Sequence, residues 1–187
     1  MPLRQPSPEQ SRRAADRAWP RHWLMTDERL GPVLTGIVAR LPEDAGIVFR
    51  HYSLPPGERR ALFDEVKASA RGRLLLLAGP AAQAAEWGAD GSHGRGPGRG
   101  LRSAPVHSHA EIRAAERDGA GLLFLSPAFA THSHPGAPTL GIARFAWLAR
   151  RTPLPVIALG GMDARRGRRL ASFGAYGWAA IDAWAAS

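Results

Sequence analysis

Short apolar runs alternate with longer amphipathic segments along most of this chain. The clearest example is 119–161, where an apolar run is followed by a polar loop, a segment of helical periodicity, a proline-bounded apolar run and a Gly-Gly pair. Two apolar runs that flank a helix in this way are typical of a βαβ unit with parallel strands. Ligands bind in the loops after such strands, because strand ends and helix N-termini meet there.

Eight apolar runs have the length of buried strands, and most are followed by a helical segment. Strands are expected at 23–26, 46–52, 73–77, 90–93, 105–108, 121–129, 155–159 and 176–181. Helices are expected at 30–41, 56–70, 80–87, 108–118, 140–151 and 163–173. This alternation predicts an α/β fold, a (β/α)8 TIM barrel, with an open doubly wound sheet as the alternative.

The predicted barrel is shortened, because two of its eight helices are missing or vestigial. The fourth run is followed by 94–103, which holds four glycines and three arginines and is a poor helix former. Only six residues follow the eighth run. The function of the Gly/Arg-rich loop at 94–103 is left open by its sequence.

An extra helix is expected near the N-terminus. Ser7 is a good helix cap, Pro8 suits the first helical position, and the helix is expected to end near residue 18. We therefore divide the chain into an N-terminal extension, 1–22, and a barrel, 23–187. The extension or a second copy of the chain, as in a homodimer, is expected to cover the flank that the missing helix leaves bare.

The composition narrows the class of protein. Cysteine is absent, which excludes disulfides and thiolate metal sites, and no apolar run approaches the ~18–20 residues of a membrane helix. A cytoplasmic protein without a membrane partner is expected. The net charge of +9 raises nucleic-acid binding as an alternative, but the arginines are scattered rather than interleaved with aromatic residues.

Several pieces of the chain resemble one known family in the right order. They are TDERL (26–30), GADGSH (88–93), HSHAE (107–111), LSPAFATHS (125–133), PLPVIALGGM (153–162) and GAYGWAAIDA (174–183). Together they resemble the thiamine phosphate synthase/thiazole tautomerase family. The resemblance implies a transferase of thiamine biosynthesis that joins a pyrimidine diphosphate to a thiazole phosphate with the help of Mg²⁺.

The same resemblance implies a phosphate-binding site. A hydroxyl pair in the loop after the sixth strand holds diphosphate oxygens in the family, and a glycine turn after the seventh strand cradles the thiazole phosphate. An arginine at the end of the second strand is a candidate anion ligand, with a rim salt bridge as its alternative role. The candidate substrate- and phosphate-binding residues are Arg50, Thr131, Ser133, His134, Gly160 and Gly161.

The chain departs from the family where Mg²⁺ is expected to bind. The acids that hold the metal in the family fall at Gly79-Pro80 and near Gly98, which offer no carboxylate oxygen. Asp182 stands where the family has a serine beside the phosphate. We therefore expect no metal site, although the histidines at 107, 109, 132 and 134 raise a Zn²⁺ or Ni²⁺ site as an alternative.

Three activities remain open at this point. The first is an enzyme of thiamine metabolism, either a divergent synthase or a metal-free thiazole phosphate isomerase in which His132 replaces the family's histidine near Pro127. The second is a non-catalytic or regulatory barrel that binds a thiamine intermediate. The third is a basic nucleic-acid-binding protein.

Overall fold

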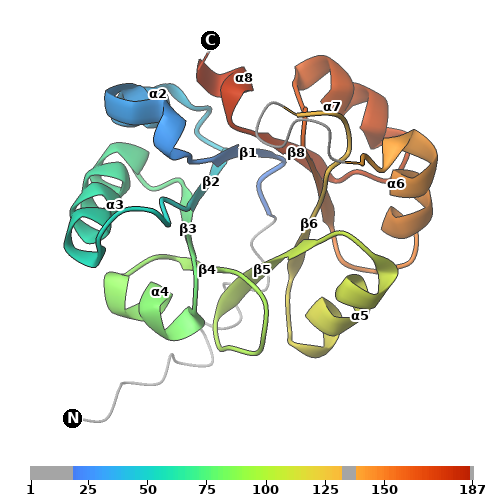
Figure 1. The fold of residues 1–187 in the computed structure, drawn as a ribbon, viewed down its shortest axis with the longest axis horizontal. Helices are drawn as coiled ribbons and strands as arrows, with labels where there is room; N and C mark the ends of the chain where they lie inside the picture. Colours follow the sequence, from blue (N-terminus) through green and yellow to red (C-terminus); the bar gives the residue numbers. More distant parts are fainter. Residues whose placement is uncertain (1–18, 132–137, 186–187) are drawn as a thin grey trace.

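The chain folds into a closed barrel of eight parallel strands (Figure 1). The structure is a computed structural model that describes residues 19–131 and 138–185. Each strand pairs with its neighbours in chain order, and β8 closes the ring by pairing with β1. The predicted TIM-barrel class is confirmed, and the open-sheet alternative is wrong.

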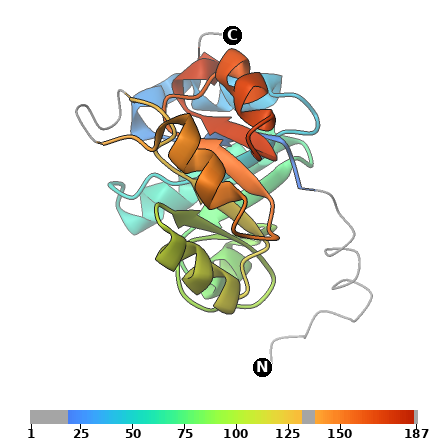
Figure 2. The ribbon, with the colours of Figure 1, turned by 90° about the vertical axis from the view of Figure 1, so that its right-hand side faces the viewer.

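The elements follow the expected order. The strands are β1 (His22–Met25), β2 (Gly46–Phe49), β3 (Leu74–Ala78), β4 (Gly91–His93), β5 (Leu101–Val106), β6 (Leu122–Leu125), β7 (Val156–Leu159) and β8 (Gly177–Ala180). The helices are η1 (Glu28–Val33), α2 (Leu34–Arg40), α3 (Pro56–Ala70), α4 (Ala81–Trp87), α5 (His109–Arg117), α6 (Gly141–Ala149), α7 (Ala164–Ala171) and α8 (Asp182–Ala185). In Figure 2, α5, α6 and α7 follow one another along one flank of the barrel.

The two helical gaps follow β4 and β8, as expected. β4 connects to β5 through the Gly/Arg-rich loop without a helix, and the helix after β8 has only four residues (Figure 1). The loop therefore descends over the outer face of β4, from the carboxyl end of that strand to the start of β5.

Some predicted boundaries were wrong for local reasons. β5 begins at Leu101 rather than residue 105, where its backbone approaches β4 so closely that a Cβ on Gly91 would lie 2.3 Å from the Leu101 carbonyl oxygen. β2 ends at Phe49 because His51 adopts a left-handed φ of 46°. In place of the helix predicted at 30–41, the chain forms a 3₁₀ helix, which is kinked at Gly31 (φ 46°, ψ −138°), followed by α2.

The core has an inner cluster inside the barrel and two outer clusters between strands and helices. Trp23 and Phe124 fill the interior and pack edge to face, with 5.3 Å between their ring centroids. The other buried members of the inner cluster are Met25, Val48, Leu74, Leu76, Ala78, Leu122, Ile157 and Ala179. These side chains close the interior, so a ligand has to bind at an end or on the flank of the barrel.

Two expectations about the ends of the chain remain predictions. The helix expected to end near residue 18 lies outside the described residues, and the division into 1–22 and 23–187 is therefore still a prediction. In the part of the chain that the structure describes, no helix combines the length and apolar character needed to cross a bilayer.

Candidate functional site

The loops that follow the eight strands lie at one end of the barrel, because all the strands are parallel. Arg50 follows β2, Thr131 lies in the loop after β6, and Gly160 and Gly161 follow β7. These four candidate residues therefore share the carboxyl-terminal rim. The other positions that the sequence pointed to in this loop lie outside the described residues: His132, Ser133 and His134.

Arg50 is fixed to the end of β1 by two hydrogen bonds. Its Nε donates to the backbone oxygen of Thr26 at 2.7 Å, and its Nη2 donates to Oδ2 of Asp27 at 2.8 Å. The salt-bridge role that the sequence left open for Arg50 is therefore real. Within the described residues Nη1 has no partner, and the side chain is 25% exposed, so one edge of the guanidinium is still available to an anion.

Asp27 is the centre of a charge network that crosses three strand ends. Its Oδ1 accepts a hydrogen bond from Nε of Arg29 at 2.7 Å, and Nη1 of Arg29 lies 3.5 Å from Oδ1 of Asp182. Burial raises the pKa of the Asp27 carboxyl, but hydrogen bonds from Arg29 and the charges of Arg50 and Arg29 outweigh burial and hold that pKa below its ordinary value. Asp27 is therefore ionised at neutral pH, and the charge of Asp182 is balanced by Arg29.

The buried pair Thr26 and His51 sets the backbone that carries Arg50. Oγ1 of Thr26 accepts the backbone N–H of Arg50 at 2.9 Å and is 3.0 Å from Nδ1 of His51. The His51 ring stacks on Phe49 with 4.9 Å between centroids. Burial lowers the pKa of His51, more than the nearby carboxylates raise it, so this ring is neutral at pH 7. These contacts hold His51 in its left-handed conformation and turn Arg50 toward the rim.

The Gly160–Gly161 pair packs against the loop after β6. Both residues have positive φ, 95° and 60°. A Cβ on Gly160 would lie 2.9 Å from Cα of Pro127, and one on Gly161 would lie 2.2 Å from the backbone oxygen of Ala130. Glycine is therefore required here by packing, whether or not a ligand binds. No hydrogen bond engages either N–H group within the described residues, which leaves two adjacent donors on the rim.

The residues at the expected metal site do not fit Mg²⁺. Gly79, Pro80 and Gly98 line a cavity of about 830 Å³ beside β4, and none of the residues that line it has a carboxylate. Mg²⁺ binds proteins through carboxylate oxygens. Across 19–131 and 138–185, moreover, no group of three or more His, Asp or Glu side chains is arranged to hold a metal ion.

The described histidines near the rim have structural partners. His93 is buried, its Nδ1 lies 2.9 Å from Oγ of Ser103, and its ring packs edge to face on Phe124. Burial, and to a smaller extent the charge of Arg50, lowers the pKa of His93 to about 3. Nδ1 of His107 lies 2.8 Å from the backbone oxygen of Ser126. His93 and His107 are thus held by hydrogen bonds within the fold.

Sequence reasoning missed the residues that position Arg50. Thr26 and Asp27 stand in the TDERL piece, which by its sequence contributes only to the family resemblance. The available signal was their place directly after β1, since a polar pair at a strand end faces the rim. His51 gave no signal, because its left-handed backbone follows from tertiary contacts.

Comparison with known proteins agrees with the family resemblance of the sequence pieces. Residues 103–184 match the family model described as thiamine monophosphate synthase. A putative thiamine-phosphate synthase 2 of Aquifex aeolicus is 37% identical over 77 residues, which are 41% of this chain and 41% of that protein. A thiamine-phosphate synthase of Myxococcus xanthus is 38% identical over 82 residues, 43% of this chain and 37% of that protein. The carboxyl-terminal part of the chain is therefore similar to thiamine phosphate synthases.

The similarity in fold to solved structures extends over most of the chain. A thiamine phosphate pyrophosphorylase from Pyrococcus furiosus superposes with a TM-score of 0.73 at 22% identity, over 87% of this chain and 86% of that protein. The barrel of FabK from Thermotoga maritima, in a mutant form, gives a TM-score of 0.72 at 18% identity over 95% of this chain and 65% of that one. The chain matches only about two fifths of the length of the two synthases. The family model match includes β6, β7 and the glycine pair.

Proposed function

We propose that this chain is a member of the thiamine phosphate synthase family and acts in thiamine biosynthesis by binding a phosphorylated thiazole or a pyrimidine diphosphate at the carboxyl-terminal rim of its barrel. The observation that carries this proposal is the pair of unengaged N–H groups on Gly160 and Gly161, in the part of the chain that matches the family model. Backbone N–H groups of glycine approach a phosphate closely because no side chain intervenes.

Arg50 and Thr131 would complete the contact with the phosphate. The free edge of Arg50 offers one more charged donor, and Thr131 lies in the loop after β6 that corresponds to the family's hydroxyl pair. The network around Arg50 is nevertheless neutral as a whole, since Arg50 and Arg29 are matched by Asp27 and Asp182. Hydrogen bonds rather than net charge would therefore supply most of the affinity.

We further propose that the chain binds its ligand without running the Mg²⁺-dependent synthase reaction. Departure of pyrophosphate needs its developing charge to be stabilised, and a bound metal supplies this in metal-dependent transfers. The described residues near the expected metal position include no carboxylate that would hold it. A binding or regulatory role in thiamine biosynthesis is thus favoured over transferase activity.

Isothermal titration with thiazole phosphate and thiamine phosphate, each with Mg²⁺ and with EDTA, tests this proposal. We expect binding that does not depend on Mg²⁺, a weakening of about tenfold in Arg50→Ala or Thr131→Ala, and no change in Arg168→Gln, an exposed arginine on α7. Formation of thiamine phosphate from both substrates at an ordinary rate would overturn the non-catalytic part. Isomerisation of thiazole phosphate would show that the chain is a metal-free isomerase rather than a non-catalytic protein. If no thiamine intermediate binds, the proposed function is wrong.

A further inference from the structure

The Gly/Arg-rich loop forms one wall of the large cavity on the flank of the barrel. The cavity of about 830 Å³ begins at the rim beside Tyr52 and His93 and runs between α4 and the loop over the outer face of β4. Its charged lining consists of three arginines, Arg95, Arg99 and Arg102, without an acidic residue. This groove occupies the place that a helix after β4 would otherwise cover.

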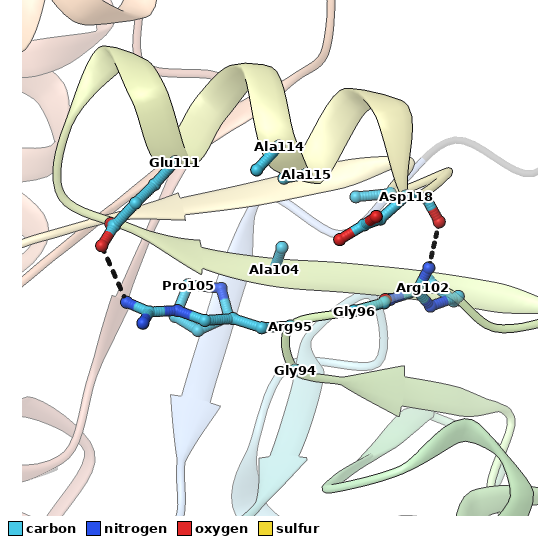
Figure 3. A pocket seen from close by; sticks show the side chains of 11 residues that line it. Gly94, Arg95, Gly96, Arg102, Ala104, Pro105, Glu111, Ala114, Ala115 and Asp118 are labelled. Atoms are coloured by element: carbon cyan, nitrogen blue, oxygen red, sulfur yellow. Dashed lines mark hydrogen bonds and ion pairs between the residues drawn. The ribbon is translucent and has the colours of Figure 1, made fainter.

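Arg102 is a buried cation without a counter-charge in the described structure. It is 4% exposed, and no carboxylate oxygen of the described residues lies within ion-pair distance of it. Its Nη1 donates to the backbone oxygen of Asp118, as Figure 3 shows, and its Nη2 donates to the backbone oxygen of Gly96. Its Nε is buried and has no hydrogen-bond partner. Burial of a charge is costly unless it is paired, and an unsatisfied buried donor adds to that cost.

Two other buried arginines show that this arrangement is unusual within the chain. Arg59 donates through Nε, Nη1 and Nη2 to Arg50, Gln83 and Ala78. Arg73 donates through its three nitrogens to the backbone oxygens of Pro42, Ala70 and Leu41. Among the described arginines, only Arg102 leaves a buried guanidinium nitrogen unused. If Arg102 served only to stabilise the fold, its buried Nε would be expected to have a hydrogen-bond partner, as the nitrogens of Arg59 and Arg73 do.

The Nε atom of Arg102, which has no hydrogen-bond partner, lies beside Gly98 in the wall of the groove. A Cβ on Gly98 would lie 3.2 Å from Nε of Arg102 and 2.6 Å from Cβ of Ala81, so only glycine leaves this position open. Gly96 and Gly100 on either side have φ values of 81° and 84°, which glycine adopts without strain. A small shift of this loop would expose Nε of Arg102 to a ligand in the groove.

The positive charges of Arg99 and Arg95 differ in whether a carboxylate balances them. Arg99 is exposed and has no ion-pair partner among residues 19–131 and 138–185. The guanidinium of Arg95 is paired with Glu111 at 3.0 Å, across the smaller cavity of about 90 Å³ on the other side of the loop (Figure 3). The uncompensated charges of the groove are therefore those of Arg99 and Arg102.

We propose that this groove binds a phosphate or diphosphate group directly through Arg99 and Arg102, without a metal ion. An oxyanion would supply the counter-charge that Arg102 lacks and accept a hydrogen bond from its Nε, and Arg99 would add a second charged donor. The choice of diphosphate as the natural ligand class rests on the proposed function, whereas the anion site itself does not. The groove would then bind a diphosphate beside the rim where the family uses Mg²⁺ and acids.

Isothermal titration with inorganic pyrophosphate in EDTA at low ionic strength tests the site. We expect binding by the unmodified chain, a weakening of about fivefold in Arg99→Gln, and one of about tenfold in Arg102→Lys, which keeps the charge but removes Nε. Arg168→Gln, which removes an exposed charge from α7 across the barrel from α4 (Figure 1), should bind pyrophosphate unchanged. Inorganic phosphate bound as tightly as pyrophosphate would also support the site and limit its ligand to a single phosphate.

Several results would overturn the inference. They are an absolute requirement for Mg²⁺, unchanged affinity in both Arg99→Gln and Arg102→Lys, or an equal loss in Arg168→Gln, which would indicate attraction by net charge alone. Much tighter binding of a single-stranded oligonucleotide through the same arginines would assign the groove to nucleic acid instead. Should Arg102→Lys fail to fold, Arg99→Gln decides the outcome. The proposed function is judged by thiazole phosphate binding and its weakening in Arg50→Ala, whereas this site is judged by pyrophosphate binding and its weakening in Arg99→Gln and Arg102→Lys. Failure of this site and failure of the proposed function therefore give different results.

Discussion

The guanidinium of Arg50 and the carboxylate of Asp27 join the ends of β2 and β1, with 2.8 Å between Nη2 and Oδ2. Both side chains are mostly buried, at 25% and 18% exposure. The pair orients Arg50 so that Nη1 is its free edge, but it also places a negative charge beside any anion that Arg50 binds. Asp27 thus positions Arg50 for anion binding, but its own negative charge repels the anion.

Replacing Asp27 with Asn separates these two effects. We expect the free energy of unfolding to fall by about 1–2 kcal/mol, because charged hydrogen bonds to Arg50 and Arg29 are lost. We expect phosphate affinity to rise by a few fold, since the repulsive charge is gone. Urea unfolding and titration with thiazole phosphate measure the two quantities. As a control, Asp64→Asn breaks an exposed pair with Arg60 and should change stability by less than about 0.5 kcal/mol. Weaker phosphate binding in Asp27→Asn would show that the Asp27 charge does not oppose anion binding.

The buried ring of His93 predicts a loss of stability in mild acid. Its pKa is about 3 in the folded chain against an ordinary value of 6.5. The unfolded chain therefore takes up a proton as the pH falls through about 6.5, while the folded chain stays neutral there until about pH 3. The free energy of unfolding should decrease toward lower pH across this window, with a slope that approaches about 1.4 kcal/mol per pH unit for this one group.

Urea unfolding between pH 4.5 and 6.5 measures that slope. His51 acts in the same direction because its pKa is also lowered. Asp27 contributes little here, since its lowered pKa gives stability that is lost only as the pH falls below its ordinary value of 3.8. His93→Gln should give a flatter profile, and an equal slope in both proteins would show that His93 is not the group responsible.

The barrel was predictable from the sequence, but the positioning of the site was not. The alternation of apolar runs and helical segments, together with the glycines at 94–100, determined the strand order and the missing helices. The end of β2 and the 3₁₀ start of the helix expected at 30–41 go with positive φ values at His51 and Gly31, which the apolar pattern does not reveal. Likewise, the composition of 94–103 predicts only that no helix forms there, and burial of Arg102 follows from its packing on α5 and the loop.

The glycine turn after β7 predicts a large effect of a single methyl group. Gly161→Ala should cost at least about 2–3 kcal/mol, because it adds both a strained left-handed residue and a contact of 2.2 Å with the Ala130 oxygen. Gly119 has a similar φ of 80° but open space around it, so Gly119→Ala should cost only about 1 kcal/mol. Urea unfolding of the two variants measures both losses, and their difference is the cost of the contact with Ala130. Equal losses of unfolding free energy would mean that the turn moves away from Ala130.

Gly98 offers the sharpest test of how the Gly/Arg-rich loop is held. Gly98→Ala places a Cβ 2.6 Å from Cβ of Ala81, so the loop has to move away from α4 at a cost of about 1–3 kcal/mol. The added methyl group also covers Nε of Arg102, and we expect pyrophosphate affinity to fall as in Arg102→Lys. Gly57→Ala, in open space on α3, should leave binding unchanged and add up to about 1 kcal/mol of stability. If Gly98→Ala loses stability but keeps full pyrophosphate affinity, the loop packs as described and Nε of Arg102 is not a ligand donor.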